Sequence, residues 1–359
     1  MKKMRAGIIG AGNISDIYLA APSKFSNIEM AGIADLLSHK AKEKAELYSI
    51  PFYETPDDLL EDPTIDIIVN LTIPSAHAKI NLAALDHGKH VYSEKPLATR
   101  YEDGKKIIEK ATALNLRVGV APDTILGAGI QTAVQLVNEG KIGKIVGAKA
   151  FMMGSGPESW HPNPAFFYET GAGPLFDMGP YYLSSLLVLL GPVDSVTGIA
   201  QTTYLERTIK SQERAGETFP VTTPTHVEGL MQFKSNVTAS ITATFDIHQS
   251  KLPFIEVYGS KGTIHVPDPN LFGGPVSYLA EGEAGWQEAP LVSGYIGNER
   301  GLGLSDMIES IQSDHQHYCH GELGLHVLEL MEKLLESSVE RTFKTLESNF
   351  SMRTLPEKV

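Results

Sequence analysis

The chain has 359 residues, of which 42% are hydrophobic and 20% are charged, and this is the composition of an ordinary globular protein. Its length exceeds that of a typical single core, so we expect two domains. The net charge of −13 argues against nonspecific binding to nucleic acid or to an anionic membrane surface, since both attract basic proteins.

The first predicted elements are a strand, a glycine turn and a helix. An apolar run over 6–9 indicates a buried strand, Gly10 and Gly12 follow at once, and a helix over 13–20 comes next. In a dinucleotide-binding unit, Gly10 would permit the tight turn and Gly12 would let the backbone approach a pyrophosphate at the helix N-terminus. Ser15 replaces the third glycine of G-x-G-x-x-G and is small enough for close packing. The candidate pyrophosphate contacts are Gly10, Gly12, Asn13 and Ile14.

A second apolar run, over 30–34, ends in Asp35, which lies 23 residues after Gly12. An acidic side chain at this distance is placed to accept hydrogen bonds from the adenosine ribose hydroxyls. Its charge would repel a 2′-phosphate, so we predict NAD, with NADP left open because His39 and Lys40 lie close by. The alternative is a surface aspartate that merely ends a strand.

Residues 1–122 alternate strand and helix patterns, which predicts a Rossmann-type α/β domain with a parallel sheet and crossover helices. The run over 66–71 predicts a strand that is covered on both faces. A helix over 74–86 follows it. Ligands of open α/β sheets bind at the carboxyl ends of the strands. The candidate cofactor contacts at this edge are Thr72, Pro74, His77, Glu94 and Lys95.

Residues 123–359 show a different pattern, in which β-rich runs follow one another without helical crossovers. This pattern predicts a second α/β domain with a large, mostly antiparallel open sheet. The expected strands lie within 145–153, 193–204, 226–233, 237–247 and 254–266. The expected helices cover 127–140, 181–190, 305–319 and 321–338.

The basic N-terminus resembles a signal peptide only in part. Its apolar stretch ends at Asn13, no cleavage pattern follows, and the longest later apolar run, 186–190, is too short to cross a bilayer. The one cysteine, Cys319, rules out an internal disulfide framework and fits a reducing compartment. We therefore expect a cytoplasmic protein.

Lys95 belongs to a Glu-Lys-Pro segment that follows a predicted strand at the ligand edge. A lysine there could donate to a substrate hydroxyl and help its proton leave. The residue before Pro96 is held extended, which would fix the direction of Lys95. The alternative is a solvated surface lysine.

Asp177 and Tyr181 lie four residues apart and would share one face of a helix. A carboxylate and a phenol together could bind a diol and move a proton, or Asp177 could merely cap the helix. Three histidines near 315–320 lie on an apparently solvated helix end, and no carboxylate–histidine pattern orders them, so we predict no metal site. The histidines considered were His248, His315, His317 and His320.

Three motifs occur in order along the chain: Gly10-Ala11-Gly12-Asn13-Ile14, Glu94-Lys95-Pro96, and Gly-x-Gly-x-Leu-x-Asp-x-Gly over 171–179. Together they resemble the glucose–fructose oxidoreductase/inositol dehydrogenase family, Gfo/Idh/MocA, over nearly the whole chain. The resemblance implies an NAD(P)-binding Rossmann domain and a second domain whose open sheet forms a homodimer or homotetramer. It also implies hydride transfer between nicotinamide and a hydroxyl or carbonyl of a sugar, sugar acid or cyclitol.

The family's catalytic set is a lysine, an aspartate and a histidine four residues after the aspartate. Lys95 and Asp177 match this set, whereas Tyr181 stands at the histidine position. Neutral imidazole accepts a proton near pH 7, but an unperturbed phenol has a pKa of about 10. Either Tyr181 is the acid/base, as tyrosine beside lysine is in short-chain dehydrogenases, or His161 serves, or dehydrogenase activity is lost.

Further candidate substrate contacts come from both predicted domains. Asp123 and Thr124 follow the last Rossmann strand, where the family places substrate-facing residues. Trp160 and Tyr168 could stack on a sugar ring or pack in the core. The sequence therefore predicts an NAD(P)-dependent dehydrogenase or reductase acting on CH–OH groups. The alternatives are a non-catalytic nucleotide sensor and an NAD-dependent glycosidase that releases a free sugar without net NADH.

Overall fold

A computed structural model describes residues 2–211, 214–292 and 294–352 of the chain. The described residues form two compact units, one from 2–126, 298–328 and 350–352, the other from the described part of 127–297 and from 329–349. This division differs from the single boundary expected at residue 122. The segment before the last helix returns to the first unit because Val120 N donates to Cys319 O (2.8 Å) at the edge of its sheet.

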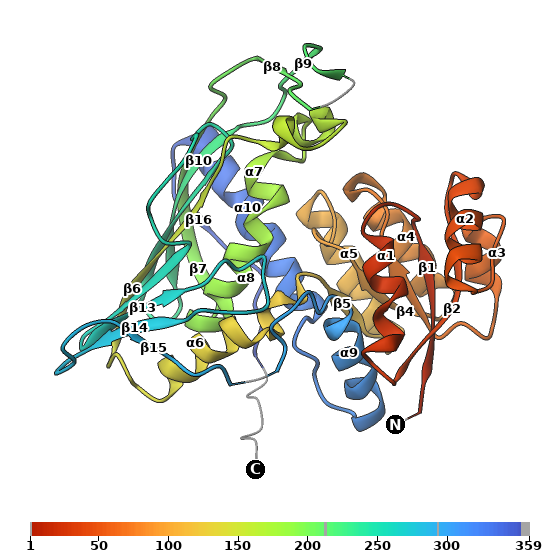
Figure 1. Cartoon of the computed structure of the whole chain (residues 1–359), viewed down its shortest axis with the longest axis horizontal. Helices are drawn as coiled ribbons and strands as arrows, with labels where there is room; N and C mark the ends of the chain where they lie inside the picture. Colours follow the sequence, from red (N-terminus) through yellow and green to blue (C-terminus); the bar gives the residue numbers. More distant parts are fainter. Residues whose placement is uncertain (1, 212–213, 293, 353–359) are drawn as a thin grey trace. The chain divides into compact units, whose positions relative to one another are not determined.

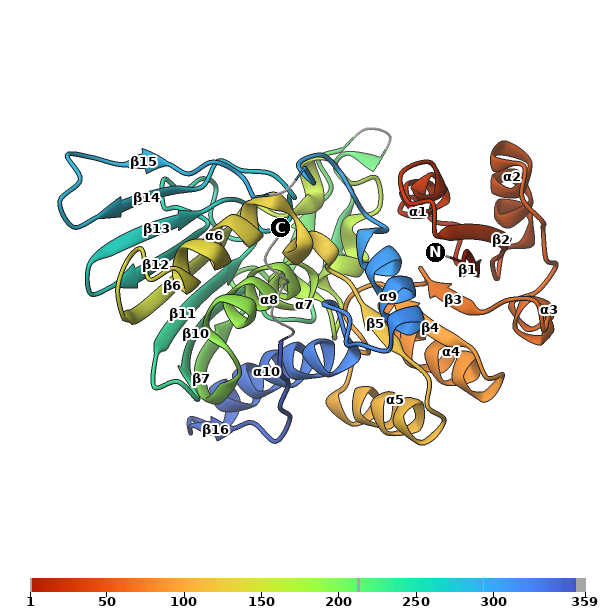
Figure 2. The same cartoon turned by 90° about the horizontal axis from the view of Figure 1, so that it is seen from below.

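The first unit contains a five-stranded sheet in the order β2-β1-β3-β4-β5, and every pairing in it is parallel (Figure 2). Its strands are β1 (Met4–Ile9), β2 (Ile28–Ala34), β3 (Ile67–Asn70), β4 (His90–Ser93) and β5 (Val118–Val120). Its α-helices are α1 (Ser15–Leu19), α2 (Ser38–Tyr48), α3 (Pro56–Glu61), α4 (Pro74–Asp86), α5 (Tyr101–Ala113) and α9 (Leu302–Ser313). The short 3₁₀ helices η1 (Ala21–Ser23) and η2 (Asp123–Leu126) also belong to it. The predicted Rossmann-type sheet is confirmed.

The strand order of this sheet locates its ligand edge. The chain passes from β1 to β2 on one side and then to β3 on the other side of β1. The topological switch point therefore lies at the carboxyl ends of β1 and β3, where open α/β sheets bind ligands. All four residues of β3 are buried, as expected for a strand covered on both faces.

The second unit contains a nine-stranded sheet in the order β15-β14-β13-β12-β6-β11-β10-β7-β16, in which only β6 and β11 pair in parallel. The main strands are β6 (Ile145–Met153), β7 (Val193–Gln201), β10 (His226–Phe233), β11 (Thr238–Thr244), β12 (Ile255–Gly259) and β13 (Gly262–Val266). The edge strands are β14 (Ser277–Ala280), β15 (Gln287–Glu288) and β16 (Lys344–Thr345), and β8 (Glu206–Thr208) pairs separately with β9 (Thr218–Pro220). The mostly antiparallel open sheet is confirmed.

Helices cover one face of this second sheet (Figure 1). They are α6 (Ala128–Asn138), α7 (Gly173–Asp177), α8 (Gly179–Leu190) and α10 (Gly321–Glu340), accompanied by the 3₁₀ helices η3 (Pro157–Ser159) and η4 (Pro164–Tyr168). The alternation along β10 explains the arrangement, since Val227, Met231 and Phe233 are buried whereas Glu228 and Leu230 between them are exposed. Among the described residues, no helix is both long and apolar enough to cross a membrane.

Candidate functional site

The glycine turn after β1 has the steric properties of a dinucleotide-binding loop. Gly10 has φ +113°, and a Cβ there would lie 2.6 Å from the backbone C and O atoms of Leu71. A Cβ on Gly12 would have no described atom within 4 Å. Gly10 is therefore needed for the turn itself, whereas Gly12 leaves an open approach to its backbone, as a bound pyrophosphate requires.

The helix that follows the turn is shorter than the sequence predicted. It covers only Ser15–Leu19, with Ile14 at the N-cap and no side chain of the described residues capping it. Ser15 is buried, and its hydroxyl donates to Gly12 O (2.7 Å), so it takes the packing position expected for the third glycine. Ser15 N itself donates to Gly12 O (3.0 Å). The N–H groups of a first helical turn that lack an intrahelical acceptor can bind an anion.

Asp35 has a structural role that the sequence analysis missed. Its Oδ2 accepts a hydrogen bond from Ala11 N (2.6 Å), and its Oδ1 accepts one from Leu37 N (2.8 Å). The carboxylate therefore ties the glycine turn to the end of β2. Each oxygen retains a second lone pair, so the predicted ribose contact stays a prediction.

The His77 side chain lies in the interior of the first unit. Its side chain is 1% exposed, with Nδ1 2.6 Å from Pro96 O and Nε2 2.9 Å from Thr72 O. Burial lowers the pKa of the imidazole, against the opposing effect of these carbonyls. Both ring nitrogens thus face backbone carbonyls, and the cofactor contact expected of His77 stays a prediction. Thr72 and Pro74 lie half-buried, just after β3 and at the start of α4.

The Glu94-Lys95-Pro96 segment follows β4 at the carboxyl edge of the parallel sheet. Glu94 Oε1 accepts a hydrogen bond from the Tyr18 hydroxyl (2.9 Å), and Oε2 accepts one from Lys95 N (3.1 Å). Lys95 is half-buried and the peptide bond to Pro96 is cis. Lys95 is therefore held in a locally ordered backbone at the edge where a ligand would bind.

Asp123 and Thr124 are buried in η2 and do not present an exposed face to a substrate. Asp123 Oδ2 accepts hydrogen bonds from Gly301 N (2.9 Å) and Gly303 N (3.2 Å), at the N-terminus of α9. The Thr124 hydroxyl is buried without a hydrogen-bond partner among the described residues. Burial raises the pKa of the Asp123 carboxyl to about 6, although the N–H groups of Gly301 and Gly303 oppose the shift.

We expect Asp123→Asn to stabilise the protein at neutral pH, with a benefit that shrinks in acid. The asparagine oxygen can still accept both N–H groups without burying a charge. Because the pKa of the Asp123 carboxyl is higher in the folded than in the unfolded protein, keeping this carboxyl ionised lowers the free energy of unfolding above pH 6, by roughly 3 kcal/mol at most. This loss of stability disappears as the pH falls from about 6 to about 4, where the carboxyl becomes protonated. Urea unfolding of wild type and variant at pH 7.5 and at pH 5 measures the difference. An equal difference at both pH values would contradict the assignment.

Asp177 and Tyr181 lie on either side of a break between two helices. Asp177 is half-buried at the end of α7, and Tyr181 is buried in the first turn of α8. Met178 is the N-cap residue of α8 and makes no side-chain capping hydrogen bond, so Asp177 does not itself hold the N-cap position of that helix. Gly173 has φ +80°, and a Cβ there would lie 2.8 Å from Pro224 O, which explains a glycine at this motif position.

The aromatic candidates differ in their surroundings. Tyr168 is fully buried, and its hydroxyl donates to Glu158 Oε2 (2.7 Å), so its environment is that of a core residue. Trp160 is 65% exposed, and its ring meets that of His161 edge-on at 5.4 Å between centroids. His161 Nδ1 accepts a hydrogen bond from Asn163 N (3.0 Å), so a neutral ring carries its hydrogen on Nε2.

The histidines at the end of α9 correct one premise of the sequence analysis. His317 and His320 are buried, because α9 ends at Ser313 and residues 314–320 turn inward toward β5. Burial lowers the pKa of His317 to about 3. Within the described ranges, no group of three or more His, Cys, Asp or Glu side chains is arranged to hold a metal ion.

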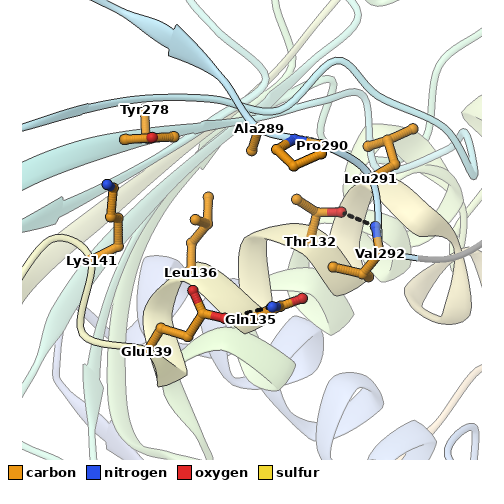
Figure 3. A pocket seen from close by; sticks show the side chains of 10 residues that line it. All are labelled: Thr132, Gln135, Leu136, Glu139, Lys141, Tyr278, Ala289, Pro290, Leu291 and Val292. Atoms are coloured by element: carbon orange, nitrogen blue, oxygen red, sulfur yellow. Dashed lines mark hydrogen bonds between the residues drawn. The ribbon is translucent and has the colours of Figure 1, made fainter. Parts of the chain in front are cut away.

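A cavity of about 450 Å³ opens in the second unit, away from every predicted site residue (Figure 3). It lies between α6 and the segment 289–292, and Leu136 and Lys141 contribute to its wall. The Lys141 ammonium lies 4.6 Å from the centroid of the Tyr278 ring. Since none of the predicted site residues lines it, the cavity does not enlarge the candidate site.

Comparison with known proteins agrees with this geometry. Residues 4–121 match the model of the oxidoreductase family with an NAD-binding Rossmann fold, and residues 130–265 match the GFO/IDH/MocA C-terminal domain. The first unit is therefore an NAD-binding domain.

Individual relatives extend the match. The protein YMR315W of Saccharomyces cerevisiae is 30% identical over 285 residues, 74% of this chain and 74% of that protein. Levoglucosan dehydrogenase of Pseudarthrobacter phenanthrenivorans is 25% identical over 289 residues, 74% of this chain and 73% of that protein. Two Schizosaccharomyces pombe oxidoreductases are 26% identical, and the chain spans only about half of their length (54% and 55%).

A solved structure shows the same fold over almost the whole chain. Levoglucosan dehydrogenase in complex with NADH and L-sorbose matches with a TM-score of 0.85 at 20% identity, covering 96% of this chain and 99% of that chain. Both family models, the yeast relative and the two-unit architecture agree. The chain belongs to the GFO/IDH/MocA family.

Proposed function

We propose that this protein is an NAD-dependent oxidoreductase that transfers a hydride between nicotinamide and a hydroxyl or carbonyl carbon of a sugar, sugar acid or cyclitol. The observation that carries the proposal is the NAD-binding unit, with Gly12 open to a ligand and Lys95 at the carboxyl edge of the same sheet. The relative named levoglucosan dehydrogenase supports a sugar-like substrate.

The residues of the first unit that would hold the cofactor are defined by the turn and the strand ends. The backbone of Gly10, Gly12, Asn13 and Ile14 would bind the pyrophosphate, and Asp35 would accept the ribose hydroxyls. Thr72, Pro74 and Glu94 lie at the same edge of the sheet. When bound, NAD supplies the hydride acceptor or, in reduced form, the donor.

Lys95, Asp177 and Tyr181 would carry the proton chemistry. In the oxidation direction, the carbinol C–H bond would break and the hydrogen would leave with its electron pair as hydride, for which bound NAD would supply the acceptor. The O–H bond of the hydroxyl group on that carbon would break as well, and Tyr181 would be the acid/base group that receives its proton. Lys95 donates a hydrogen bond to the substrate oxygen and stabilises its developing negative charge, and Asp177 orients the hydroxyl groups.

We also propose that the protein forms a homo-oligomer and that it is located in the cytoplasm. Ile199 and Leu230 are 71% and 57% exposed on the strands β7 and β10, on the sheet face opposite the helices, and this apolar surface supports a homo-oligomer. The buried Cys319 supports the reducing cytoplasm as the setting. Trp160 is the exposed aromatic ring proposed to contact a sugar ring.

The test is an NAD-coupled screen of sugars, sugar acids and inositols, read as formation of NADH. Under the proposal, at least one substrate class produces NADH in a protein-dependent reaction. A protein that binds NADH yet oxidises nothing would be a nucleotide sensor. Release of free sugar from a glycoside without net NADH would identify a glycosidase that uses NAD transiently.

Tyr181→Phe and His161→Ala distinguish the two candidate acid/base groups. Removal of the acid/base side chain is expected to lower kcat by roughly 10²- to 10⁴-fold. We expect this loss in Tyr181→Phe, which keeps the ring and removes only the hydroxyl, and a change within about threefold in His161→Ala. The measurement is kcat at saturating NAD and substrate for both variants. The reverse pattern would transfer the role to His161.

A further inference from the structure

A continuous network of hydrogen bonds between buried polar side chains connects the end of β3 with the segment after β4. Asn70, the last residue of β3, is fully buried, and its Oδ1 accepts hydrogen bonds from the Thr72 hydroxyl (2.7 Å) and Thr72 N (3.2 Å). Its amide nitrogen donates to Asn81 Oδ1 (2.8 Å) and to His77 O (3.2 Å). The side chain of Asn70 is thus fixed on both sides.

The other end of this hydrogen-bond network lies at the backbone next to Lys95. The amide nitrogen of Asn81 donates to Ser93 Oγ (3.2 Å) and to Leu97 O (3.3 Å). His77 Nδ1 lies 2.6 Å from Pro96 O, the shortest contact of the network. Glu94 N in turn donates to Asn70 O (2.9 Å). Residues on both sides of Lys95 are therefore anchored, through the side chains of Asn81 and His77 and through the backbone carbonyl of Asn70.

Side chains such as those of Asn70, Asn81 and His77 are seldom fully buried, and where they are buried their polar atoms are hydrogen-bonded. Apolar residues would fill these positions if packing were the only requirement. The network instead joins the ends of β3 and β4 at the ligand edge. Thr72 N also lies close to Gly10, because a Cβ added to Gly10 would sit 2.9 Å from it. It connects the glycine turn, where the pyrophosphate would bind, with the lysine segment.

We propose that His77, Asn70 and Asn81 are positioning residues that hold the backbone of Lys95 in its reactive orientation, and that the decisive contact is from His77 Nδ1–H to Pro96 O. The proposal rests on the role given to Lys95 under the proposed function. A carbonyl oxygen only accepts, so a neutral ring can satisfy only one of the two carbonyls that face it, and the shorter contact takes the proton.

Three substitutions of His77 separate positioning from packing. His77→Phe keeps a planar ring and removes both polar contacts. His77→Asn places an amide nitrogen near the position of Nδ1 and can still donate to Pro96 O, whereas His77→Gln places it near Nε2, toward Thr72 O. The matched control is His87→Phe, a change of an exposed histidine at the C-terminus of the same helix.

We expect kcat to fall roughly 10- to 100-fold in His77→Phe and His77→Gln, because a displacement of about 1 Å at a reacting group costs on this order. His77→Asn and His87→Phe should stay within about threefold of wild type. KM and the Kd for NADH should change little in all four variants. Circular dichroism and the unfolding midpoint report whether each variant is folded.

A second readout does not depend on turnover. The rate at which an amine-specific reagent modifies Lys95, followed by mass spectrometry, should change in His77→Phe and His77→Gln and return to the wild-type value in His77→Asn. Equal behaviour of the asparagine and glutamine variants in both assays would overturn the proposal. A wild-type protein that binds NADH but oxidises no substrate would refute the proposed function, while the labelling assay would still test the positioning role.

Discussion

Lys95→Met is expected to lower kcat by roughly 10²- to 10⁴-fold while the Kd for NADH stays within a few-fold of wild type. The size of the loss is that of a positioned proton-transfer or oxyanion-stabilising group, and methionine keeps the length of the side chain without its charge. NADH titration followed by fluorescence measures the affinity, and steady-state kinetics with the substrate identified in the screen measure kcat.

Lys79→Met is the matched control for this substitution. Lys79 is an exposed lysine on α4 of the same unit, so its replacement removes the same charge at a position away from the ligand edge. We expect its kcat and Kd to equal those of wild type. If Lys95→Met kept full turnover, Lys95 would have no part in the chemistry. The inference that His77 positions Lys95 for the reaction would then be wrong as well.

Gly12→Ala and Gly10→Ala are expected to fail in different ways. Gly12 has open space where a Cβ would sit, so the alanine variant should fold with the wild-type unfolding midpoint. A methyl group there would obstruct the pyrophosphate and cost the hydrogen bonds to a charged group. That loss of about 1.5–3 kcal/mol corresponds to a Kd for NADH raised by roughly 10- to 100-fold.

In Gly10→Ala the fold itself should suffer. The new Cβ would lie 2.6 Å from the backbone of Leu71, which has no flexible side chain to move aside, and the backbone φ of +113° is strained for any residue with a Cβ. We expect a loss of a few kcal/mol in unfolding free energy. A destabilised Gly12→Ala, or a Gly12→Ala that binds NADH normally, would contradict the assignment of the open side of the turn to a ligand.

Much of the first unit could be predicted from local sequence patterns. The run of apolar residues in β3 and the glycine turn after β1 are both found where they were expected, because strand periodicity and turn sterics act over a few residues. The motif spacing also identified the family. The site residues Lys95 and Gly12 emerged from the same local signals.

The polar residues around the site could not be assigned in this way. His77 was expected as a cofactor contact, and no role was predicted for Asn70 and Asn81, although two asparagines within apolar runs are a signal that could have been used. His77 contacts a carbonyl 19 residues away, and Asp123 binds backbone 178 residues away. Neither partner is visible to a pattern that spans a single element.

The sequence by itself therefore determined most of the main strands and helices, the glycine turn, the NAD-binding unit and the family, since each depends on residues close together in the chain. Only the tertiary structure decided that His77, Asp123, His317 and Tyr168 are interior residues with backbone or side-chain partners. The physical reason is that a polar side chain becomes structural or functional according to what surrounds it, and packing of distant segments sets those surroundings.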